Sequence, residues 1–404
     1  MKRYDPVAAM ANIRREFGEH GGVNMSVEAS TTFTVMDAAT MPELFKGRLG
    51  PDAGGCYLYG RHFNPTVYVL GRQLAAMEGA EAAYCTASGM GAISAVVMQL
   101  CGPGDHAVVS HTLYGGSYAL FHDYLPAKAG VNSTLVDIGD LAAVERAFKP
   151  STRLLYVETL SNPMLRMADL PALAKIARKH GVPLVVDNTF CPLSVQPMQH
   201  GADIVVHSLT KFVSGASDII AGAICASAEF IGRLMDLHTG SLMLLGPTMD
   251  PHCAFNLSLR LPHLSLRMLE HSRRARFMAE RLAARGDAVI YPGLPTHPDH
   301  AILKRLADPQ YHGGGILGLD LKTAERANRL MQALQHEQHF GFIAVSLGYF
   351  DTLMSCSASS TSSEMTDSDM REAGISPGLV RISVGITGDL EQRWSQLETA
   401  LKSL

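Results

Sequence analysis

Short apolar stretches alternate with amphipathic stretches from about residue 65 to about residue 260. The apolar stretches are rich in Val, Ile, Ala and Leu, which is typical of strands buried on both faces. The amphipathic stretches, such as 141–148 and 170–180, have the spacing of helices. The alternation predicts an α/β architecture with a mainly parallel sheet covered by helices. The predicted strands are 82–87, 106–110, 154–158, 183–187, 204–207 and 221–226.

The pattern changes at both ends of this region. A helix and then an irregular Gly-, Thr- and Ser-rich arm (21–60) precede it, and a long helix with an antiparallel α+β segment follows it. A run of Ser, Thr, Ala and Cys is predicted to be a loop. We therefore expect an N-terminal arm (1–62), a large domain (63–260) and a smaller C-terminal domain (261–404). The predicted C-terminal elements are helices 265–285, 324–334 and 388–401, strands 316–321, 343–346 and 379–384, and loop 355–363.

Composition narrows the class of protein. Of 404 residues, 47% are hydrophobic and 18% are charged, with a formal net charge of -4, which excludes wholesale disorder and disfavours a nucleic-acid partner. No apolar run reaches the roughly 18 residues that a membrane helix needs, and the charged N-terminus does not resemble a secretory signal. Seven scattered cysteines without a Cys-x-x-Cys favour a reducing compartment, the cytoplasm. His297 and His300 fit a loop better than a metal site, so no metal is expected.

Polar residues follow two of the predicted strands directly. Asp187 ends one strand, and Lys211 follows the next within four residues of its end. Alone, such an Asp is usually a helix cap and such a Lys is usually solvated. Together at one edge of a sheet, they are the groups that pyridoxal phosphate needs: an amine for a Schiff base and an acid that keeps the pyridine nitrogen protonated.

A phosphate site is predicted after the first strand of the sheet. Ser88-Gly89-Met90-Gly91 leads into an apolar helix, and small residues at a helix N-terminus leave backbone N–H groups free for a phosphate. The alternative is an ordinary tight turn. The one G-x-G-x-x-G (313–318) leads into a predicted strand instead of a helix, and no G-x-x-x-x-G-K occurs, which disfavours dehydrogenases that bind nicotinamide and proteins that bind nucleoside triphosphates.

Several longer motifs resemble one enzyme family. From about residue 30 to 400 the chain is similar to the Cys/Met-metabolism family of fold-type-I pyridoxal-phosphate enzymes, and within it to the methionine γ-lyases. The motifs that carry the resemblance are YGRHFNPT (59–66), ASGMGAI (87–93), TLYGG (112–116), VETLSNP (157–163), VVDNTF (185–190), HSLTKF (207–212), VSLG (345–348) and GLVRISVG (378–385).

The resemblance implies roles for the cofactor-binding residues. Lys211 would be the Schiff-base lysine and proton shuttle, Asp187 the partner of the pyridinium, and Tyr114 the ring that stacks on the cofactor and protonates the leaving group. A phosphate cradle would come from this subunit and its neighbour, which implies a homo-oligomer, at least a dimer and for this family usually a tetramer built as a dimer of dimers. Its matching residues are Gly89, Met90, Ser208 and Thr210, with Tyr59 and Arg61 reaching a neighbouring subunit.

The resemblance also implies a substrate site. Arg381 would grip the substrate α-carboxylate with its planar guanidinium, and Ser346 and Asn162 would help to hold the carboxylate and the cofactor. Each residue has an ordinary alternative: Tyr59 and Arg61 can form a surface cation–π pair, and Tyr114 can be a core aromatic. The order and spacing of the whole set favour the functional interpretation.

The activity implied by the resemblance is γ-elimination from an L-amino acid, which ends in a 2-oxo acid and ammonia. A γ-replacement transferase uses the same residues and stays open as an alternative. A pyridoxal-phosphate-binding paralogue without catalysis is a more distant one.

The chain departs from the methionine γ-lyases in the predicted substrate pocket. Position 116 is Gly instead of Cys, Ala216 replaces a His, and the run 356–362 is Cys-Ser-Ala-Ser-Ser-Thr-Ser. Three acids follow this run: Glu364, Asp367 and Asp369. We hypothesise that the γ-substituent is polar, for example the guanidinooxy group of canavanine or an acylated homoserine oxygen. The alternative is that the acids only solvate a surface helix.

Overall fold

The computed structural model describes residues 3–13, 17–18, 20–46, 48–50, 57–360 and 362–404. Cys56 and Thr361, which belong to the cysteine set and the serine-rich run considered above, therefore lie outside the described residues. Among the described helices, none is both long and apolar enough to cross a membrane.

A seven-stranded sheet forms the centre of the large domain, in the order β1-β7-β6-β5-β4-β2-β3. The predicted α/β architecture with a mainly parallel sheet is confirmed, and the structure adds two features. Strand β7 runs antiparallel to both of its neighbours, so the sheet is mixed. Strand β3 was not predicted, because its sequence NSTLV is polar and partly exposed, as edge strands often are. The strands are β1 Ala82–Thr86, β2 His106–Ser110, β3 Asn132–Val136, β4 Thr152–Glu158, β5 Leu184–Asp187, β6 Ile204–Ser208 and β7 Gly222–Ala226.

Helices cover both faces of this sheet and bury two separate apolar clusters, as alternate strand residues point to opposite faces. Val205 belongs to one cluster and Val206 to the other. Side-chain caps fix where several helices begin; Asn64 and Ser88, for example, accept backbone N–H groups of the first turn. One face is covered by α1 Pro6–Ile13, α3 Pro65–Glu78, α7 Leu141–Arg146, α8 Leu170–Lys179 and α11 Pro251–Arg260, and the other by α4 Gly89–Leu100, α6 Leu125–Ala129, α9 Ala228–Leu234 and α10 Ser241–Leu245. The short helix α5 Gly115–Ala119 contacts α4.

A second sheet, with the order β10-β11-β12-β9-β8, carries the C-terminal part of the chain. All of its neighbouring strands are antiparallel except β10 and β11. The long helix α12 contributes to the core of the large domain at its start and to the core of the small domain further on. The elements are α12 Leu264–Ala284, β8 Val289–Ile290, α13 His300–Leu306, β9 Ile316–Asp320, α14 Ala324–Gln332, β10 Phe342–Ile343, β11 Leu353–Cys356, α15 Asp367–Glu372, β12 Leu379–Ser383 and α16 Leu390–Lys402.

Two predictions in the C-terminal part were wrong. The strand expected at 343–346 ends at Ile343, because Ser346 has a φ of 82°, which no extended strand can contain. The loop expected at 355–363 begins inside β11, where Ser355 pairs with Arg381 of β12. The domain limits at residues 62 and 260 stay a proposal; the two sheets lie on either side of the second limit.

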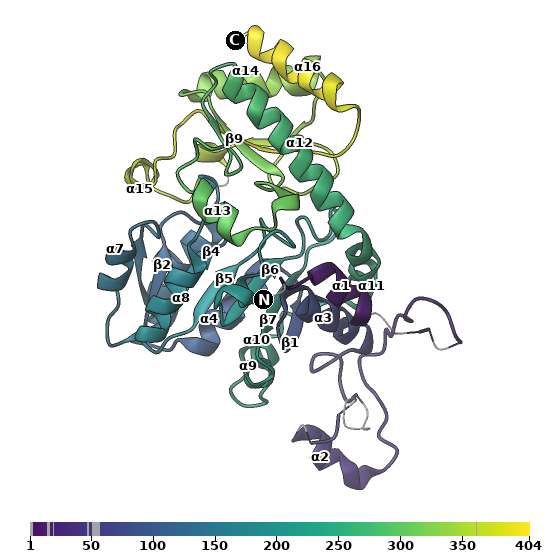
Figure 1. Ribbon diagram of the computed structural model, residues 1–404. Helices are drawn as coiled ribbons and strands as arrows, with labels where there is room; N and C mark the ends of the chain where they lie inside the picture. Colours follow the sequence, from purple (N-terminus) through teal and green to yellow (C-terminus); the bar gives the residue numbers. More distant parts are fainter. Residues whose placement is uncertain (1–2, 14–16, 19, 47, 51–56, 361) are drawn as a thin grey trace.

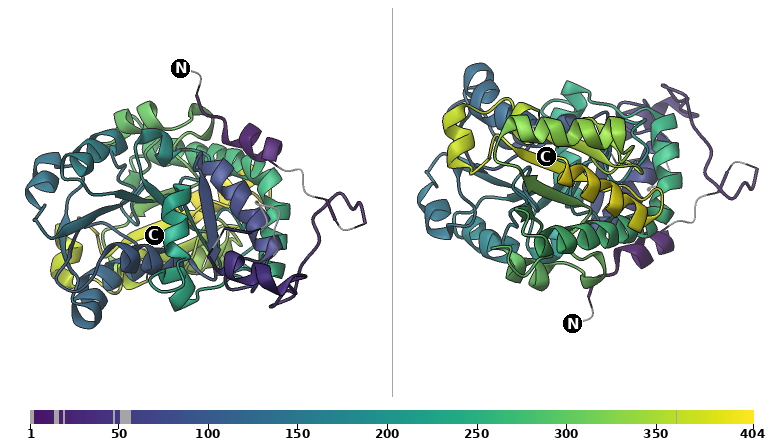
Figure 2. Two further views of the ribbon diagram at one scale, coloured as in Figure 1. Left: turned by 90° about the horizontal axis from the view of Figure 1, so that it is seen from below. Right: turned by 90° about the horizontal axis from the view of Figure 1, so that it is seen from above.

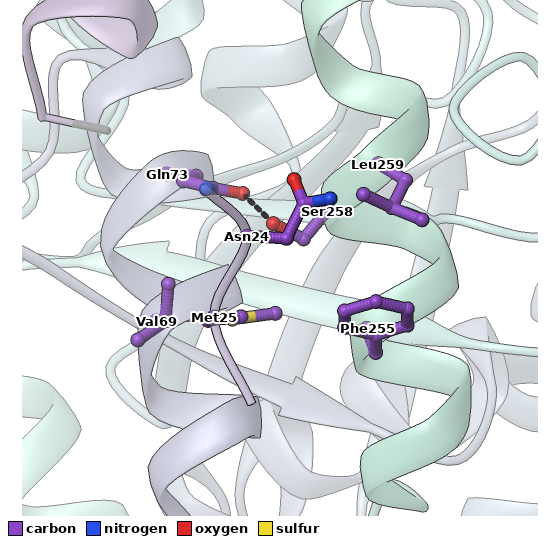
Figure 3. A pocket seen from close by; sticks show the side chains of 7 residues that line it. All are labelled: Asn24, Met25, Val69, Gln73, Phe255, Ser258 and Leu259. Carbon is purple, nitrogen blue, oxygen red and sulfur yellow. Dashed lines mark hydrogen bonds between the residues drawn. The ribbon is translucent and has the colours of Figure 1, made fainter. Parts of the chain in front are cut away.

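The small domain lies against the large one, and α12 runs alongside both (Figure 1). The arm around α2 (Met41–Phe45) extends away from the body of the molecule in Figure 1, and Figure 2 views the molecule along the direction of this arm. Where the arm leaves the body, Asn24 and Met25 pass between α3 and α11, and the Ser258 hydroxyl donates to Gln73 Oε1 at 2.9 Å (Figure 3). The cavity beside this contact, about 10 Å³, has room for little more than one water molecule.

Candidate active site

A cavity of about 440 Å³ lies where strands β4, β5 and β6 end and the small domain begins. Carboxyl ends of neighbouring strands are the usual place for a ligand in such sheets. The cavity is lined by residues of both domains, so residues far apart in the sequence meet there. Of the residues predicted for the site, those that line it are Gly89, Met90, Tyr114, Asn162, Asp187, Ser208, Thr210, Lys211, Ser346 and Arg381.

Lys211 lies in the turn after β6, and its amine points to the small domain. Its Nζ donates a hydrogen bond to Ser346 Oγ at 2.8 Å. Burial, and then the nearby charge of Arg381, lower the pKa of Lys211 to about 8. A large share of this amine is therefore neutral near pH 8, which suits a nucleophile or a proton acceptor.

Asp187 is the last residue of β5 and lies on the floor of the cavity. Its Oδ1 accepts the backbone N–H of Thr189 at 2.9 Å, and its Oδ2 accepts the Tyr156 hydroxyl at 3.4 Å. Burial raises the pKa of Asp187, while the hydrogen bonds from Thr189 oppose that rise. A buried carboxylate held in this way can pair with a protonated ring nitrogen.

The start of α4 forms a second wall. Ser88 caps this helix by accepting the N–H of Gly91 at 3.0 Å, and the first-turn N–H groups of an α-helix have no partners inside the helix. A Cβ on Gly89 would lie 2.8 Å from Ser208 Cβ, so only glycine lets the helix end approach β6 this closely. These groups in one cavity fit pyridoxal phosphate. The N-terminus of α4 suits its phosphate, the buried acid Asp187 suits its ring nitrogen, and Lys211, whose pKa is lowered, suits its aldehyde.

Thr210 is engaged within the protein as well as lining the cavity. Its hydroxyl donates to Ala221 O at 3.2 Å and accepts the Ala221 N–H at 3.0 Å. These bonds fix the turn that carries Lys211.

Arg381 enters the cavity from β12. It is 3% exposed, and it donates to Asn162 Oδ1 at 3.0 Å and to the backbone oxygen of Ser346 at 2.8 Å. Within the described part of the chain, no carboxylate forms an ion pair with it. Burial lowers the pKa of Arg381 to about 10, so it stays cationic at neutral pH. A cation buried without a protein anion is suited to bind an anionic group of a ligand.

Tyr114 stands before the first residue of α5 at the mouth of the cavity, with 44% of its surface exposed. Burial of the hydroxyl, and then the charge of Glu364, raise the pKa of Tyr114, so it is protonated at neutral pH. Its ring lies over Gly116, where a Cβ would be 2.6 Å from Tyr114 Cε1. Gly116 is not among the residues that line the cavity, and it acts on the site only through this ring.

Glu158, the last residue of β4, was not predicted as a site residue. It is 5% exposed, lines the cavity, and accepts the backbone N–H groups of Tyr114 at 2.7 Å and Asn162 at 2.9 Å. Burial, and then the charge of Asp187, raise the pKa of Glu158 to about 8. A charged residue directly after the buried run 154–157 was the available signal in the sequence.

Tyr59 and Arg61 lie outside the cavity of their own chain. The Arg61 guanidinium carbon lies 5.8 Å from the centre of the Tyr59 ring, and Arg61 Nη1 donates to the backbone oxygen of Met243 at 2.7 Å. This is the surface cation–π pair that the sequence left open as an alternative.

The segment after β11 reaches the cavity only in part. Ser360 and Glu364 line it, whereas Asp369 is engaged elsewhere, accepting the Tyr118 hydroxyl at 2.7 Å and the Thr366 hydroxyl at 2.6 Å. Ala216 does not line the cavity. Of Glu364 and Asp369, Glu364 is the one placed to meet a ligand, and the side chain of Asp367 lies outside the described part of the structure.

Comparisons with known proteins match almost the whole chain to one family. The model of the Cys/Met metabolism PLP-dependent enzyme family matches residues 7–402. Methionine γ-lyase of Arabidopsis thaliana is 57% identical over 98% of this chain and 90% of its own length. O-succinylhomoserine sulfhydrylase of Pseudomonas aeruginosa is 35% identical over 99% of this chain and 96% of its own.

A solved structure from Campylobacter jejuni has the same fold. That protein is assigned as an O-acetylhomoserine (thiol)-lyase and carries a pyridoxyl-lysine monophosphate. Its TM-score to this chain is 0.89 at 27% sequence identity, and the match covers 99% of this chain and 100% of that one. The predicted fold-type-I architecture and the predicted cofactor are thereby confirmed. The chain belongs to the Cys/Met metabolism family of pyridoxal-phosphate-dependent enzymes, and it is a lyase of that family.

Proposed function

We propose that the enzyme catalyses γ-elimination: it removes a leaving group from Cγ of an L-amino acid and releases a 2-oxo acid and ammonia. The observation that carries the proposal is that a buried Arg381 without an anionic partner among the described residues and a Lys211 of lowered pKa line one cavity. The 57% identity to a protein named methionine γ-lyase supports elimination over replacement.

Each residue of the cavity has a place in this reaction. Arg381 binds the substrate carboxylate and Asn162 orients the guanidinium. Lys211 takes the proton from Cα and moves protons between neighbouring carbons, and Tyr114 donates a proton to the departing group. Asp187 keeps the pyridine nitrogen of pyridoxal phosphate protonated. When bound, the cofactor supplies an electron sink for the negative charge that develops on the substrate.

A product assay tests the reaction type. Purified enzyme should release 2-oxobutanoate and ammonia from methionine, cystathionine or O-acetylhomoserine, and Lys211→Ala should release neither. The competing function is γ-replacement, which the 35% identity to a protein named O-succinylhomoserine sulfhydrylase keeps open. A thioether formed in place of 2-oxobutanoate when a thiol is added would establish replacement.

We further propose that the pocket accepts a polar or cationic γ-substituent. Glu364 and Ser360 line the cavity, and the charge of Glu364 acts on the Tyr114 hydroxyl, where the leaving group departs. Glu364→Gln should lower kcat/KM for canavanine more than for methionine. Glu372→Gln, which changes an exposed acid outside the cavity, should change neither. Methionine as the best substrate, with Glu364→Gln without effect, would refute this specificity.

The assembly and location of the enzyme remain proposals. The arm around α2 extends from the body and Tyr59 is 44% exposed, which supports a role for the arm and the Tyr59–Arg61 pair against a neighbouring subunit in a dimer or tetramer (Figure 1). The described cysteines are free, which supports a reducing compartment such as the cytoplasm. Light scattering would test the assembly, which should be the same for Tyr59→Ala and the wild type. A titration with pyridoxal phosphate would test the role of Tyr59, since the variant should bind the cofactor more weakly.

A further inference from the structure

A continuous chain of hydrogen bonds joins the groups to which we assign the reaction. It starts at the Tyr114 backbone N–H and ends at the Lys211 amine, and it passes through both domains. Its links are Tyr114 N to Glu158 Oε1 (2.7 Å), Asn162 N to Glu158 Oε2 (2.9 Å), Arg381 Nη1 to Asn162 Oδ1 (3.0 Å), Arg381 Nη2 to Ser346 O (2.8 Å) and Lys211 Nζ to Ser346 Oγ (2.8 Å).

Glu158 is the residue in this chain of bonds whose side chain accepts backbone N–H groups from two separate segments. One oxygen holds the N–H at the start of α5, and the other holds an N–H of the turn that follows β4. Both oxygens of a carboxyl group can accept an N–H group, whether the group is ionised or protonated. A glutamine has only one acceptor oxygen, and its NH2 group would face the second N–H as donor against donor.

The place of Glu158 in the sheet makes this connection rigid. It is the last residue of β4, directly beside Asp187 of β5 in the parallel register, and it is 5% exposed. Backbone on both sides of the cavity is therefore fixed to the same edge of the sheet that carries Asp187. Neither Tyr114 nor Asn162 can move without breaking a bond to this carboxylate.

We propose that Glu158 is a positioning residue that sets the distance between Tyr114 and the Asn162–Arg381 grip. Arg381 fixes the substrate carboxylate, and Tyr114 acts on the substituent at Cγ, so this distance decides whether the leaving group meets its proton donor. Misplacement of such groups by about 1 Å can cost about a hundredfold in rate. The proposal rests on the function proposed above for Arg381 and Tyr114.

Double-mutant cycles test this proposal, since they measure whether two residues act together. Glu158→Gln should lower kcat by about tenfold to a hundredfold and raise KM by about tenfold, because one of the two buried backbone N–H groups loses its acceptor. When Glu158→Gln is added to Tyr114→Phe, kcat should decrease by less than about threefold. When Glu158→Gln is added to Asn162→Ala, KM should likewise increase by less than about threefold.

A binding measurement separates this proposal from the proposed reaction. L-norvaline has a carboxylate but no γ leaving group. Its dissociation constant from the cofactor-loaded enzyme therefore measures how tightly Arg381 and Asn162 bind the carboxylate, without turnover. Glu158→Gln should raise that constant about tenfold, and the effect should shrink in Asn162→Ala. If the wild type binds norvaline but eliminates from no substrate, the proposed function fails while this proposal still stands.

Two controls keep the result interpretable. Glu81→Gln changes another glutamate that accepts a backbone N–H, that of Ala228 at 2.9 Å, outside the cavity, and should leave kcat and KM unchanged. If Glu158→Gln does not fold, Glu158→Asp, which keeps both carboxyl oxygens but is one methylene shorter, replaces it in every cycle. Additive effects in both backgrounds, or wild-type constants for the single variant, would overturn the proposal.

Discussion

The Lys211 amine donates a hydrogen bond to the Ser346 hydroxyl at 2.8 Å, and thereby joins the large domain to the small one at the centre of the cavity. Ser346 has a φ of 82°, an uncommon conformation for a residue other than glycine. The same residue accepts a bond from Arg381 through its backbone oxygen at 2.8 Å. Ser346 therefore contacts the proposed proton shuttle and the proposed carboxylate grip at once.

Replacing Ser346 separates the role of its hydroxyl from that of its backbone. Ser346→Ala and Ser346→Gly both remove the hydroxyl, so both should lower kcat by about tenfold, the effect of one lost hydrogen bond. Only glycine adopts a positive φ without strain, so Ser346→Gly should be about 1 kcal/mol more stable than Ser346→Ala. Steady-state kinetics and urea unfolding measure the two effects. Wild-type kcat in both variants would show that the Ser346 hydroxyl does not contribute to catalysis.

Gly116 should control the position of the Tyr114 ring. A Cβ at this position would lie 2.6 Å from Tyr114 Cε1, well inside normal contact distance. Gly116→Ala and Gly116→Cys should both displace the ring by about 1 Å to restore ordinary carbon–carbon contact. Crystal structures of the two variants would show the displacement, and kcat should change by at least about tenfold. An unmoved ring in either variant would contradict this role for Gly116.

Cofactor uptake should depend on pH through the Lys211 amine. Burial lowers the pKa of this group to about 8, so the amine is protonated and unreactive below pH 8 and largely neutral above it. The rate at which apoenzyme takes up pyridoxal phosphate should rise with pH toward about 8 and level off above it. Stopped-flow absorbance between pH 7 and 10 measures the profile. A rate that keeps rising toward pH 10.5, the ordinary pKa of lysine, would contradict the shift.

The same shift predicts how the stability of the apoprotein varies with pH. Between about pH 8 and pH 10.5 the unfolded chain holds a proton on Lys211 that the folded chain has released. Since the unfolded state binds more protons there, the free energy of unfolding should rise with pH across this window. Denaturation of the wild type and of Lys211→Met should diverge in that window. Parallel curves would show that folding does not perturb this amine.

A buried pair beneath the cavity should stabilise the edge of the sheet. His207 Nε2 lies 2.7 Å from Glu78 Oε1, and both side chains are essentially inaccessible to solvent. Removing one member of such a pair usually costs about 3–5 kcal/mol, because the other is left buried without its partner. His207→Ala and Glu78→Ala should each lose stability of this order, and the double variant should lose less than the sum. Strictly additive losses in urea unfolding would rule out the coupling.

The sequence predicts the floor of the cavity better than its upper wall. Asp187 and Lys211 follow apolar strands in sequence, and parallel strands bring their carboxyl ends together, so their proximity follows from the pattern alone. Arg381 and Ser346 lie more than 130 residues further along the chain. No periodicity indicates that these two residues meet Lys211; only the resemblance to a family suggested it.

The features that were missed share a physical reason. Strand β3 is a polar edge strand, and β11 is a short strand of Ser, Cys and two apolar residues, so neither has a strong pattern. Glu158 ends an apolar strand as Asp187 does, but its partners are backbone N–H groups, which the sequence does not reveal. The engagement of Asp369 with Tyr118 likewise depends on the packing of two domains.

The most direct test is whether pyridoxal phosphate is attached covalently to Lys211. Hydride reduction of the cofactor-loaded enzyme, followed by proteolysis and mass spectrometry, should find the reduced pyridoxyl phosphate group on the peptide that contains Lys211. The Lys211→Ala variant, treated in the same way, should carry the group nowhere. A colourless protein with an unmodified Lys211 peptide, or the group on a different lysine, would contradict the account.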